Sequence, residues 1–463
     1  MAVIAAACVL GACALAPPPD REALQKDALP NVKVPANYAA GGTAATVRDD
    51  WLAEFHDAEL EALVKEAVAY NADLRVAQAR VEQASAYLKA SGAMLYPQVS
   101  LLARGGGKMS DSSGLSGVGL FVNWELDLWG RVRAGQAFAD QQYQAAQLDA
   151  VYARQSIAAL VAKGWFLATE ARMQKAQATS MRQASEHLAS LAEDRLRVGR
   201  GDEYDVVVAR ASVATMRDTE RNLENAYQQA LRSIETLVGR YPAAALAAPP
   251  RLAAWPGDVP VGLPAELMER RPDVVAAERR VAGAFYRTEE AKAARLPRIT
   301  LTASVTSISS ELFVLQNHDN PVVSFGASLL QPIFLGGQLQ AQVEVRTAEQ
   351  KQAIADYARV SSRAFAEVED ALSNGFSLAE RETILASAVN QNVRGLELAG
   401  IRYKVGSGDL RAVQQQQLSL FSSQVALVRV QAERLVQRVN LHLALGGSFE
   451  VESAVPRDAV SRR

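Results

Sequence analysis

Cysteine, histidine and aromatic residues are scarce in this sequence. The only two cysteines, Cys8 and Cys13, stand at the very start, so no disulfide stabilises the remaining 450 residues. The four histidines lie far apart and no pair has metal-ligand spacing, which argues against a histidine-based metal or catalytic cluster. Aromatic residues make up 6% of a chain that is 49% hydrophobic, so alanine, valine and leucine provide most of the apolar surface, as is typical of closely packed helices.

An excess of charge of one sign and a long hydrophobic run are also lacking. The balance of 49 basic against 51 acidic residues excludes a broad basic face for nucleic acid. No apolar run reaches the roughly 18 residues that indicate a membrane-crossing helix. There is no nucleophile–base pair, glycine-rich phosphate loop or metal-ligand cluster, so the sequence predicts no catalytic site, no metal and no cofactor. We therefore expect that the chain is not an enzyme.

The N-terminus resembles a bacterial lipoprotein signal. An apolar stretch of signal-peptide length ends in Leu10-Gly11-Ala12, directly before Cys13. This pattern predicts cleavage after residue 12 and lipidation of Cys13. Alanine rather than aspartate after Cys13 favours sorting to the outer membrane. An ordinary secretory signal and a buried helix are the alternatives.

An internal duplication organises the rest of the chain. Residues 72–101 align with residues 272–301 at a constant offset of 200, with eight identities in 30 positions. Further on, the offset becomes 207 and is then maintained, which is not expected of chance similarity between alanine-rich helices. The pairs at this second offset include Gly130/Gly337, Arg195/Arg402, Val198-Gly199/Val405-Gly406, Gly201-Asp202/Gly408-Asp409 and Gly239/Gly446.

Proline marks the boundary between the two copies. Six prolines between Pro242 and Pro264 predict an extended linker. The region before about residue 50 is rich in proline, alanine and glycine and predicts an extended arm. The predicted parts are a signal peptide (1–12), a lipidated N-terminal arm (13–50), a first repeat (51–241), a Pro-rich linker (242–264), a second repeat (265–447) and a C-terminal tail (448–463).

Each repeat is predicted to contain a helix, two strands, a very long helix, a glycine turn and another helix. Residues 131–198 lack proline, and an unbroken helix of this length measures about 100 Å; residues 338–405 repeat the pattern. Positions alternately three and four residues apart, apolar except for Glu220, run from Val213 to Leu237, and apolar positions with the same spacing run from Phe421 to Val439, as in coiled coils. A second apolar line lies beside the positions from Phe421 to Val439. A helix with two apolar lines packs against neighbours on both sides, which favours the wall of a helical cylinder over a two-stranded coiled coil.

Between the helices the hydrophobic period changes to two. Apolar and polar residues alternate over 118–128 and 299–306, and more weakly over 97–103 and 322–333. These lengths and this alternation suit tilted transmembrane strands, although a half-buried soluble sheet has the same pattern. Four strands cannot close a barrel in lipid, so a membrane location requires two or three chains, with eight or twelve strands.

Several segments, in this order and spacing, are specific to a known family, and the chain resembles TolC-like outer-membrane efflux proteins of the lipoprotein branch that includes OprM and NodT-type proteins. The segments that carry the resemblance are Asp50-Trp51, Asn71-Ala72-Asp73-Leu74-Arg75, Trp124-Glu125-Leu126-Asp127-Leu128-Trp129-Gly130-Arg131, Glu269-Arg270-Arg271-Pro272-Asp273-Val274, Pro332-Ile333-Phe334 and Tyr403-Lys404-Val405-Gly406-Ser407-Gly408-Asp409-Leu410.

The resemblance implies a mostly helical chain with a small transmembrane β part. A long coiled-coil α-barrel would continue into a β-barrel of four strands per chain, twelve in a homotrimer. The implied function is a passive exit duct for small molecules, lipid-anchored in the outer membrane with a long periplasmic extension. The implied partners are a periplasmic adaptor protein and an inner-membrane transporter of the resistance–nodulation–division (RND) type. The alternatives are a duct for type I protein secretion and, in a different class, a periplasmic coiled-coil scaffold without a pore.

The resemblance also implies which residues contact the adaptor and narrow the periplasmic opening. The adaptor contacts are two turns, Val198-Gly199-Arg200-Gly201 (turn 1) and Val405-Gly406-Ser407-Gly408 (turn 2). Relatives have a Leu-Asp-Ala-Gln stretch after the second turn, and Gln415 here takes the place of its aspartate. A ring of amides excludes anions less than a ring of carboxylates does, so cation selectivity is not expected. The gate candidates are Asp202, Asp205, Asp409, Gln414 and Gln415, although an aspartate in such a place is more often a solvated turn residue or a helix cap.

Overall fold

The computed structural model describes residues 17–43, 45–47, 49–104, 115–310 and 322–449. The predicted signal peptide and the lipidation site at Cys13 lie outside these residues. The chain divides into two compact units. Unit 1 contains residues 78–149 and 273–361 with the N-terminus up to residue 32, and unit 2 contains residues 33–77, 150–272 and those from 362 onward.

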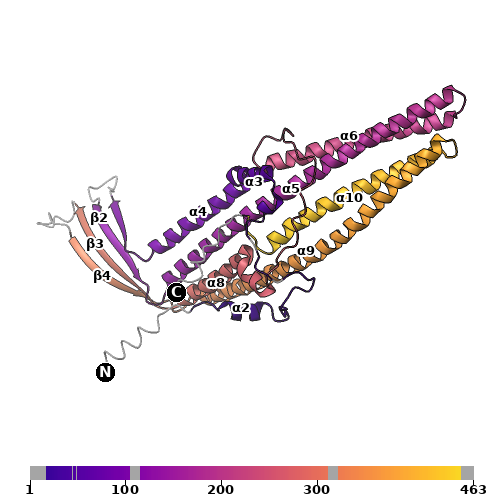
Figure 1. Ribbon diagram of the computed structural model, residues 1–463. Helices are drawn as coiled ribbons and strands as arrows, with labels where there is room; N and C mark the ends of the chain where they lie inside the picture. The colour runs from indigo at the N-terminus through magenta and orange to yellow at the C-terminus, as the bar shows by residue number, and fades with distance from the viewer. Residues whose placement is uncertain (1–16, 44, 48, 105–114, 311–321, 450–463) are drawn as a thin grey trace. The chain divides into compact units, whose positions relative to one another are not determined.

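The order of elements repeats along the chain (Figure 1). The first copy follows α2 (Arg21–Ala28), η2 (Ala53–Phe55) and α3 (Ala58–Tyr70), and consists of α4 (Ala72–Ala93), β1 (Gln98–Arg104), β2 (Leu115–Leu126), α5 (Arg131–Arg197) and α6 (Glu203–Leu237). The second copy follows η3 (Pro264–Glu266) and α7 (Leu267–Arg270), and consists of α8 (Pro272–Ala293), β3 (Arg298–Ser310), β4 (Val322–Leu330), α9 (Gln338–Lys404) and α10 (Leu410–Ala444). Corresponding helices have identical lengths of 22, 67 and 35 residues. The predicted tandem duplication and element order are therefore confirmed.

Unit 1 contains an antiparallel sheet in the order β1-β2-β3-β4. Directly paired residues share a face, and one cross-strand row consists of Leu101, Leu120, Val305 and Val323. The next row on this face is Val99, Val122, Ala303 and Phe325, whereas a row on the opposite face is Ser100, Phe121, Ser304 and Ser324. The hydroxyl oxygens of Ser304 and Ser324 are 2.7 Å apart. The sheet thus has one continuous apolar face and one largely polar face.

Several predicted strand bounds differ from the structure, most of all that of β3, which extends to Ser310 rather than residue 306; two other ends have a local reason. β2 ends at Leu126 rather than residue 128, because the Asp127 carboxylate accepts the backbone N–H groups of Val132 and Arg133 (3.0 and 2.8 Å) and so caps the start of α5. β4 ends at Leu330 rather than residue 333, because Pro332 has no N–H to donate to a ladder.

The N-terminal arm is not extended throughout, contrary to prediction. Asp20 caps α2 by accepting the N–H of Ala23 at 2.8 Å, and Leu24 is buried. Arg21 forms an ion pair with Glu278 of α8 at 2.9 Å. Within unit 1, α2 is therefore attached to α8 by an ion pair, and it also buries an apolar side chain.

Unit 2 is built from two antiparallel helix pairs, in which α6 returns along α5 and α10 returns along α9 (Figure 1). Arg182 of α5 joins Glu220 of α6 at 2.6 Å, and Arg434 of α10 joins Glu382 of α9 at 2.7 Å. Every position of the two predicted heptad seams is buried or half-buried. The main core lies beside α3 and is centred on large side chains such as Leu60, Trp165, Phe166, Ile234 and Val439.

The Pro-rich linker packs onto this core and is not a free spacer. Ala248 is fully buried, and the buried carboxylate of Glu235 accepts the N–H groups of Ala244, Ala245 and Leu246 at 2.6–3.1 Å. Burial by itself raises the pKa of Glu235, but these backbone donors bring the pKa below its ordinary value. The carboxylate is therefore held charged at the beginning of the linker.

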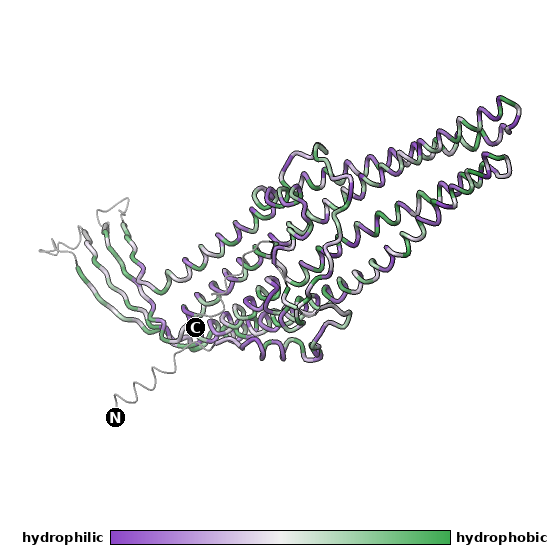
Figure 2. The backbone as a smooth tube through the Cα atoms, viewed as in Figure 1, coloured by the Kyte–Doolittle hydropathy of each residue, from purple (hydrophilic) through white to green (hydrophobic). Residues whose placement is uncertain are grey.

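Hydrophobic and hydrophilic residues alternate at short intervals along the helices (Figure 2). In the part of the chain that the structure describes, none of the helices combines the length and the apolar character needed to cross a membrane.

Candidate functional site

The two predicted turns have the same backbone geometry at the end of a 67-residue helix. Gly199 and Gly406 have φ values of +70° and +79°, a left-handed conformation that glycine adopts without strain. The N–H of Arg200 donates to the carbonyl of Arg195 at 2.9 Å, and the N–H of Ser407 donates to the carbonyl of Arg402 at 2.9 Å. These bonds satisfy the last free carbonyls of α5 and α9 and reverse the chain.

The second glycine of each turn has a different role, because it lets the backbone of the turn lie close to the backbone of the preceding helix. A Cβ atom on Gly201 would lie 2.7 Å from the backbone nitrogen of Leu196, and one on Gly408 would lie 3.0 Å from that of Tyr403. The preceding valines, Val198 and Val405, are 67% and 73% exposed. A Cβ atom on Gly199 or Gly406 would meet nothing within 4 Å. Each turn therefore presents an apolar side chain and an unobstructed glycine to solvent, which leaves room for another protein to approach.

Two of the candidate gate aspartates are helix caps, the alternative that the sequence left open. Asp202 accepts the N–H of Tyr204 at 3.1 Å at the start of α6, and Asp409 accepts the N–H of Arg411 at 2.9 Å at the start of α10. Asp205 is half-buried in the first turn of α6. All three lie within one helical turn of the glycine turns.

The glutamine run divides between packing and surface positions. Gln414 and Gln417 are buried, at 9% and 7% exposure, whereas Gln415 is exposed. Of the two candidate gate glutamines, only Gln415 therefore presents its side chain to solvent in the subunit. Sequence alone could not separate them, because burial depends on the neighbours of α10.

Contacts between the two helix pairs near the turns were not predicted from the sequence. The guanidinium of Arg195 lies over the ring of Tyr403, and that of Arg411 lies over the ring of Tyr204 at 5.3 Å from the centroid. Apolar residues from all four helices, among them Ala192, form a small core below them. A signal was present in the sequence, because Tyr204 and Arg411 occupy equivalent positions of the duplication at the offset of 207.

Further from the turns, a buried carboxyl connects the two helix pairs. Glu170 of α5 is 9% exposed, accepts the side-chain amide of Gln174 at 2.6 Å and lies 3.8 Å from Arg429 of α10. Burial raises the pKa of Glu170 to about 7, with Glu433 adding to the shift and Arg429 and Gln174 opposing it. This group changes charge near neutral pH.

Among the residues that the structure describes, no group of three or more His, Cys, Asp or Glu side chains is arranged to hold a metal ion. The distinctive features are instead a sheet with an apolar outer face and two long helix pairs that end in matching turns. In a membrane, an apolar face of this kind meets lipid, and the open edges of the sheet pair with further strands. Fold and site together define a subunit of an oligomeric membrane duct.

Comparison with known proteins supports this class. The family model described as "Outer membrane efflux protein" matches residues 63–240 and 263–447, one stretch in each copy of the duplication. The chain is 30% identical to the pyoverdine export outer membrane protein OpmQ of Pseudomonas aeruginosa, over 97% of each chain. It is 31% identical to outer membrane protein OprJ of the same organism, over 96% of this chain and 95% of the relative. The crystal structure of the open state of the Neisseria gonorrhoeae MtrE outer membrane channel superimposes with a TM-score of 0.81 at 27% identity, covering 91% of this chain and 98% of that one.

The chain belongs to the outer membrane efflux protein family. It is a subunit of an outer-membrane efflux channel and not an enzyme. Channels of this family are trimers that work with a periplasmic adaptor and an inner-membrane transporter. This membership excludes the periplasmic scaffold without a pore and confirms the predicted outer-membrane location.

Proposed function

We propose that turn 1 and turn 2 are the surfaces on which the periplasmic adaptor docks, and that contacts between the two helix pairs just below them hold the periplasmic end of the channel closed. The observation that carries this proposal is the shared geometry of the turns. Both have a left-handed glycine with open space around it, followed by a glycine that permits close packing.

The contacts below the turns support a gating role. Arg195 with Tyr403, and Arg411 with Tyr204, connect the helix pairs through side chains only one turn from the proposed docking surface. A cation over an aromatic ring contributes about 1 kcal/mol at an exposed site, which is small enough for adaptor binding to replace. Docking at the turns would thus shift a balance between closed and open arrangements.

The exposed side chain of Gln415 supports the proposal that the passage has an uncharged lining near the contacts that hold it closed. Three copies of Gln415 in a trimer would contribute amides in place of carboxylates, so the opening is not expected to prefer cations at this level. Asp202 and Asp409 are used as helix caps, which reduces the negative charge they offer to the passage.

The proposal has two further parts: Cys13 carries the lipid that anchors the chain, and an RND-type transporter supplies the energy for export. The Leu10-Gly11-Ala12-Cys13 sequence supports an acyl anchor, and the anchored branch of this family is associated with efflux of small molecules rather than with protein secretion. The transporter then drives the flow through a passive duct.

Single-channel recording tests the proposal most directly. The detergent-purified oligomer is inserted into a planar bilayer, and its subunits are counted by native mass spectrometry. We expect a trimer with low resting conductance that rises when the cognate adaptor is added. A trimer whose conductance does not respond to the adaptor, or whose response survives replacement of both turns by unrelated loops, would refute the docking role.

A further inference from the structure

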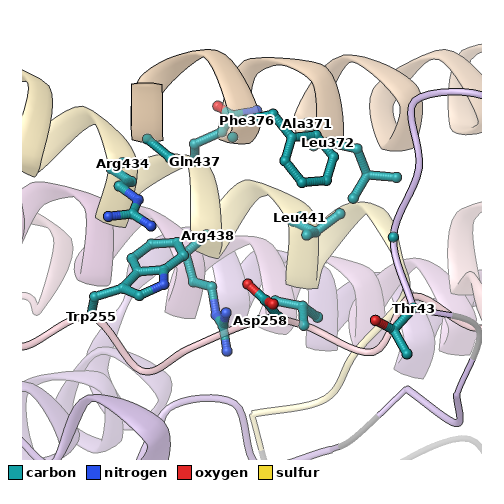
Figure 3. A pocket seen from close by; sticks show the side chains of 14 residues that line it. Thr43, Trp255, Asp258, Ala371, Leu372, Phe376, Arg434, Gln437, Arg438 and Leu441 are labelled. Atoms are coloured by element: carbon teal, nitrogen blue, oxygen red, sulfur yellow. The ribbon is translucent and has the colours of Figure 1, made fainter. Parts of the chain in front are cut away.

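A cavity of about 280 Å³ lies within unit 2, away from the turns (Figure 3). Its wall combines four segments that are distant in the sequence: the arm at Thr43, the linker from Trp255 to Val259, α9 and α10. The lining is mainly apolar, and it includes the aromatic rings of Trp255 and Phe376, both of which are exposed. This volume approaches that of sites which hold small organic molecules.

Two arginines line the cavity, and the charge of each is already compensated. Arg434 forms an ion pair with Glu382 at 2.7 Å and stacks over the indole of Trp255, 3.8 Å from the ring centroid. Arg438 forms an ion pair with Glu54 at 2.6 Å and donates to the carbonyl of Gly257. Neither guanidinium therefore offers a free positive charge to a ligand.

The third charged residue of the lining, Asp258, has no such compensation. Its side chain is exposed at the cavity, and within the described part of the chain it takes part in no hydrogen bond or ion pair that would neutralise it. The cavity thus combines an aromatic, apolar wall with one uncompensated carboxylate. An anion would be repelled there, and a neutral hydrocarbon would leave the carboxylate unused.

We propose that this cavity is a binding site for a small aromatic organic cation, such as a protonated arylmethylamine. The aromatic part would pack against Trp255, Phe376 and Leu441, and the ammonium group would pair with Asp258. Cation–π attraction to the exposed ring of Phe376 would add to this pairing. The proposal does not depend on the docking role of the turns.

Binding at this position has a structural consequence. The ligand would contact α9 through Ala371, Leu372 and Phe376 and α10 through Leu441, together with the linker and the arm. It would therefore stabilise the packing of the second helix pair. This would be a ligand-binding site in the channel wall, distinct from the turns.

The test uses two probes with the same ring and opposite charge, 2-naphthylmethylammonium and 2-naphthylacetate. Each is titrated into the detergent-solubilised trimer by isothermal titration calorimetry in the same detergent. We expect the cation to bind at least about tenfold more tightly than the anion. Asp258→Asn should remove most of this preference, whereas Asp218→Asn, which changes an exposed aspartate on α6, should leave it unchanged.

A second variant separates binding in the cavity from partition into detergent. A Cβ atom on Gly375 of α9, which lines the cavity, would meet nothing within 4 Å, so Gly375→Leu introduces a side chain that occupies part of the cavity and replaces a helical glycine by a better helix former. Binding should be lost in this variant while the trimer is retained. Equal affinity for both probes, no effect of Asp258→Asn, unaltered binding to the Gly375→Leu trimer, or no binding to the wild-type trimer because a neighbouring subunit covers the cavity would each overturn the proposal.

Discussion

The guanidinium carbon of Arg195 lies 4.6 Å from the ring centroid of Tyr403, and Nη1 of Arg195 donates a hydrogen bond to the backbone carbonyl of Tyr403 at 3.3 Å. One side chain at the end of α5 therefore holds both the ring and the backbone at the end of α9. Together with the contact of Arg411 over Tyr204, this contact joins the two helix pairs directly below both turns.

Arg195→Ala should loosen the two turns from one another. Loss of a stacked cation and a hydrogen bond removes about 1 kcal/mol of coupling, which corresponds to a roughly fivefold shift toward the open arrangement. The measurement is the open probability of single channels in a planar bilayer. Tyr403→Phe, which retains both the ring and the carbonyl, should behave like the wild type.

Arg210→Ala is the matched control, because Arg210 pairs with Glu193 inside the first helix pair only, at 2.8 Å. It should leave the open probability unchanged. If Arg210→Ala and Arg195→Ala have the same effect, the contact between the helix pairs is not the gate.

Gly406→Val should weaken efflux while the trimer remains intact. The left-handed backbone at φ +79° costs a β-branched residue roughly 1–2 kcal/mol, so turn 2 would change shape locally and present a different surface to the adaptor. Adaptor affinity and cellular efflux are measured together. Gly400→Ala, at a helical position of α9 with free space for a Cβ, should leave both unchanged. Normal adaptor affinity in Gly406→Val would remove turn 2 from the docking surface.

Glu170→Gln should change the pH dependence of stability. Because the pKa of Glu170 is raised to about 7 in the folded protein, the folded state retains a proton that the unfolded chain releases near pH 4.5, and stability falls as pH rises between these values. The variant lacks this loss, so it should be more stable than the wild type at pH 8, by up to about 3 kcal/mol. At pH 4 the difference should disappear. Thermal unfolding of the solubilised trimer at a series of pH values measures this, and a pH-independent difference would contradict it.

Phe325→Lys should hinder assembly in the membrane far more than Ser324→Lys. Phe325 is 84% exposed on the apolar face of the sheet, and its neighbour Ser324 belongs to the polar face. A lysine facing lipid near the bilayer centre costs about 2–4 kcal/mol, whereas one facing an aqueous interior costs little. The yield of heat-resistant trimer in outer-membrane fractions is the readout. Equal yields for the two variants would show that the apolar face does not meet lipid.

Cys13→Ala should abolish labelling of the protein by radioactive palmitate, because the thiol that accepts the lipid is lost. Cys8→Ala is the control, since Cys8 precedes the predicted cleavage site and should be removed with the signal. Continued labelling of the Cys13→Ala protein would place the acyl group elsewhere.

The sequence determined the architecture of the repeats because their signals are local and periodic. Glycine, proline and heptad positions repeat at fixed offsets, and the same offsets reappear in the boundaries of α4 and α8, α5 and α9, and α6 and α10. Period-two alternation similarly identified the two faces of the sheet, because side chains alternate strictly along a strand. The exceptions were strand ends, where single residues such as Asp127 and Pro332 decided the boundary.

Only the tertiary structure decided which residues of the turns and of α10 are available for function. Burial of Gln414 beside exposed Gln415 and the contact of Arg195 with Tyr403 both depend on which helices lie together. The cavity beside Trp255 likewise brings together four segments separated by up to several hundred residues. The physical reason is that periodicity fixes which side of a helix is apolar, whereas partners, exposure and the local balance of charge arise only when distant segments pack against each other.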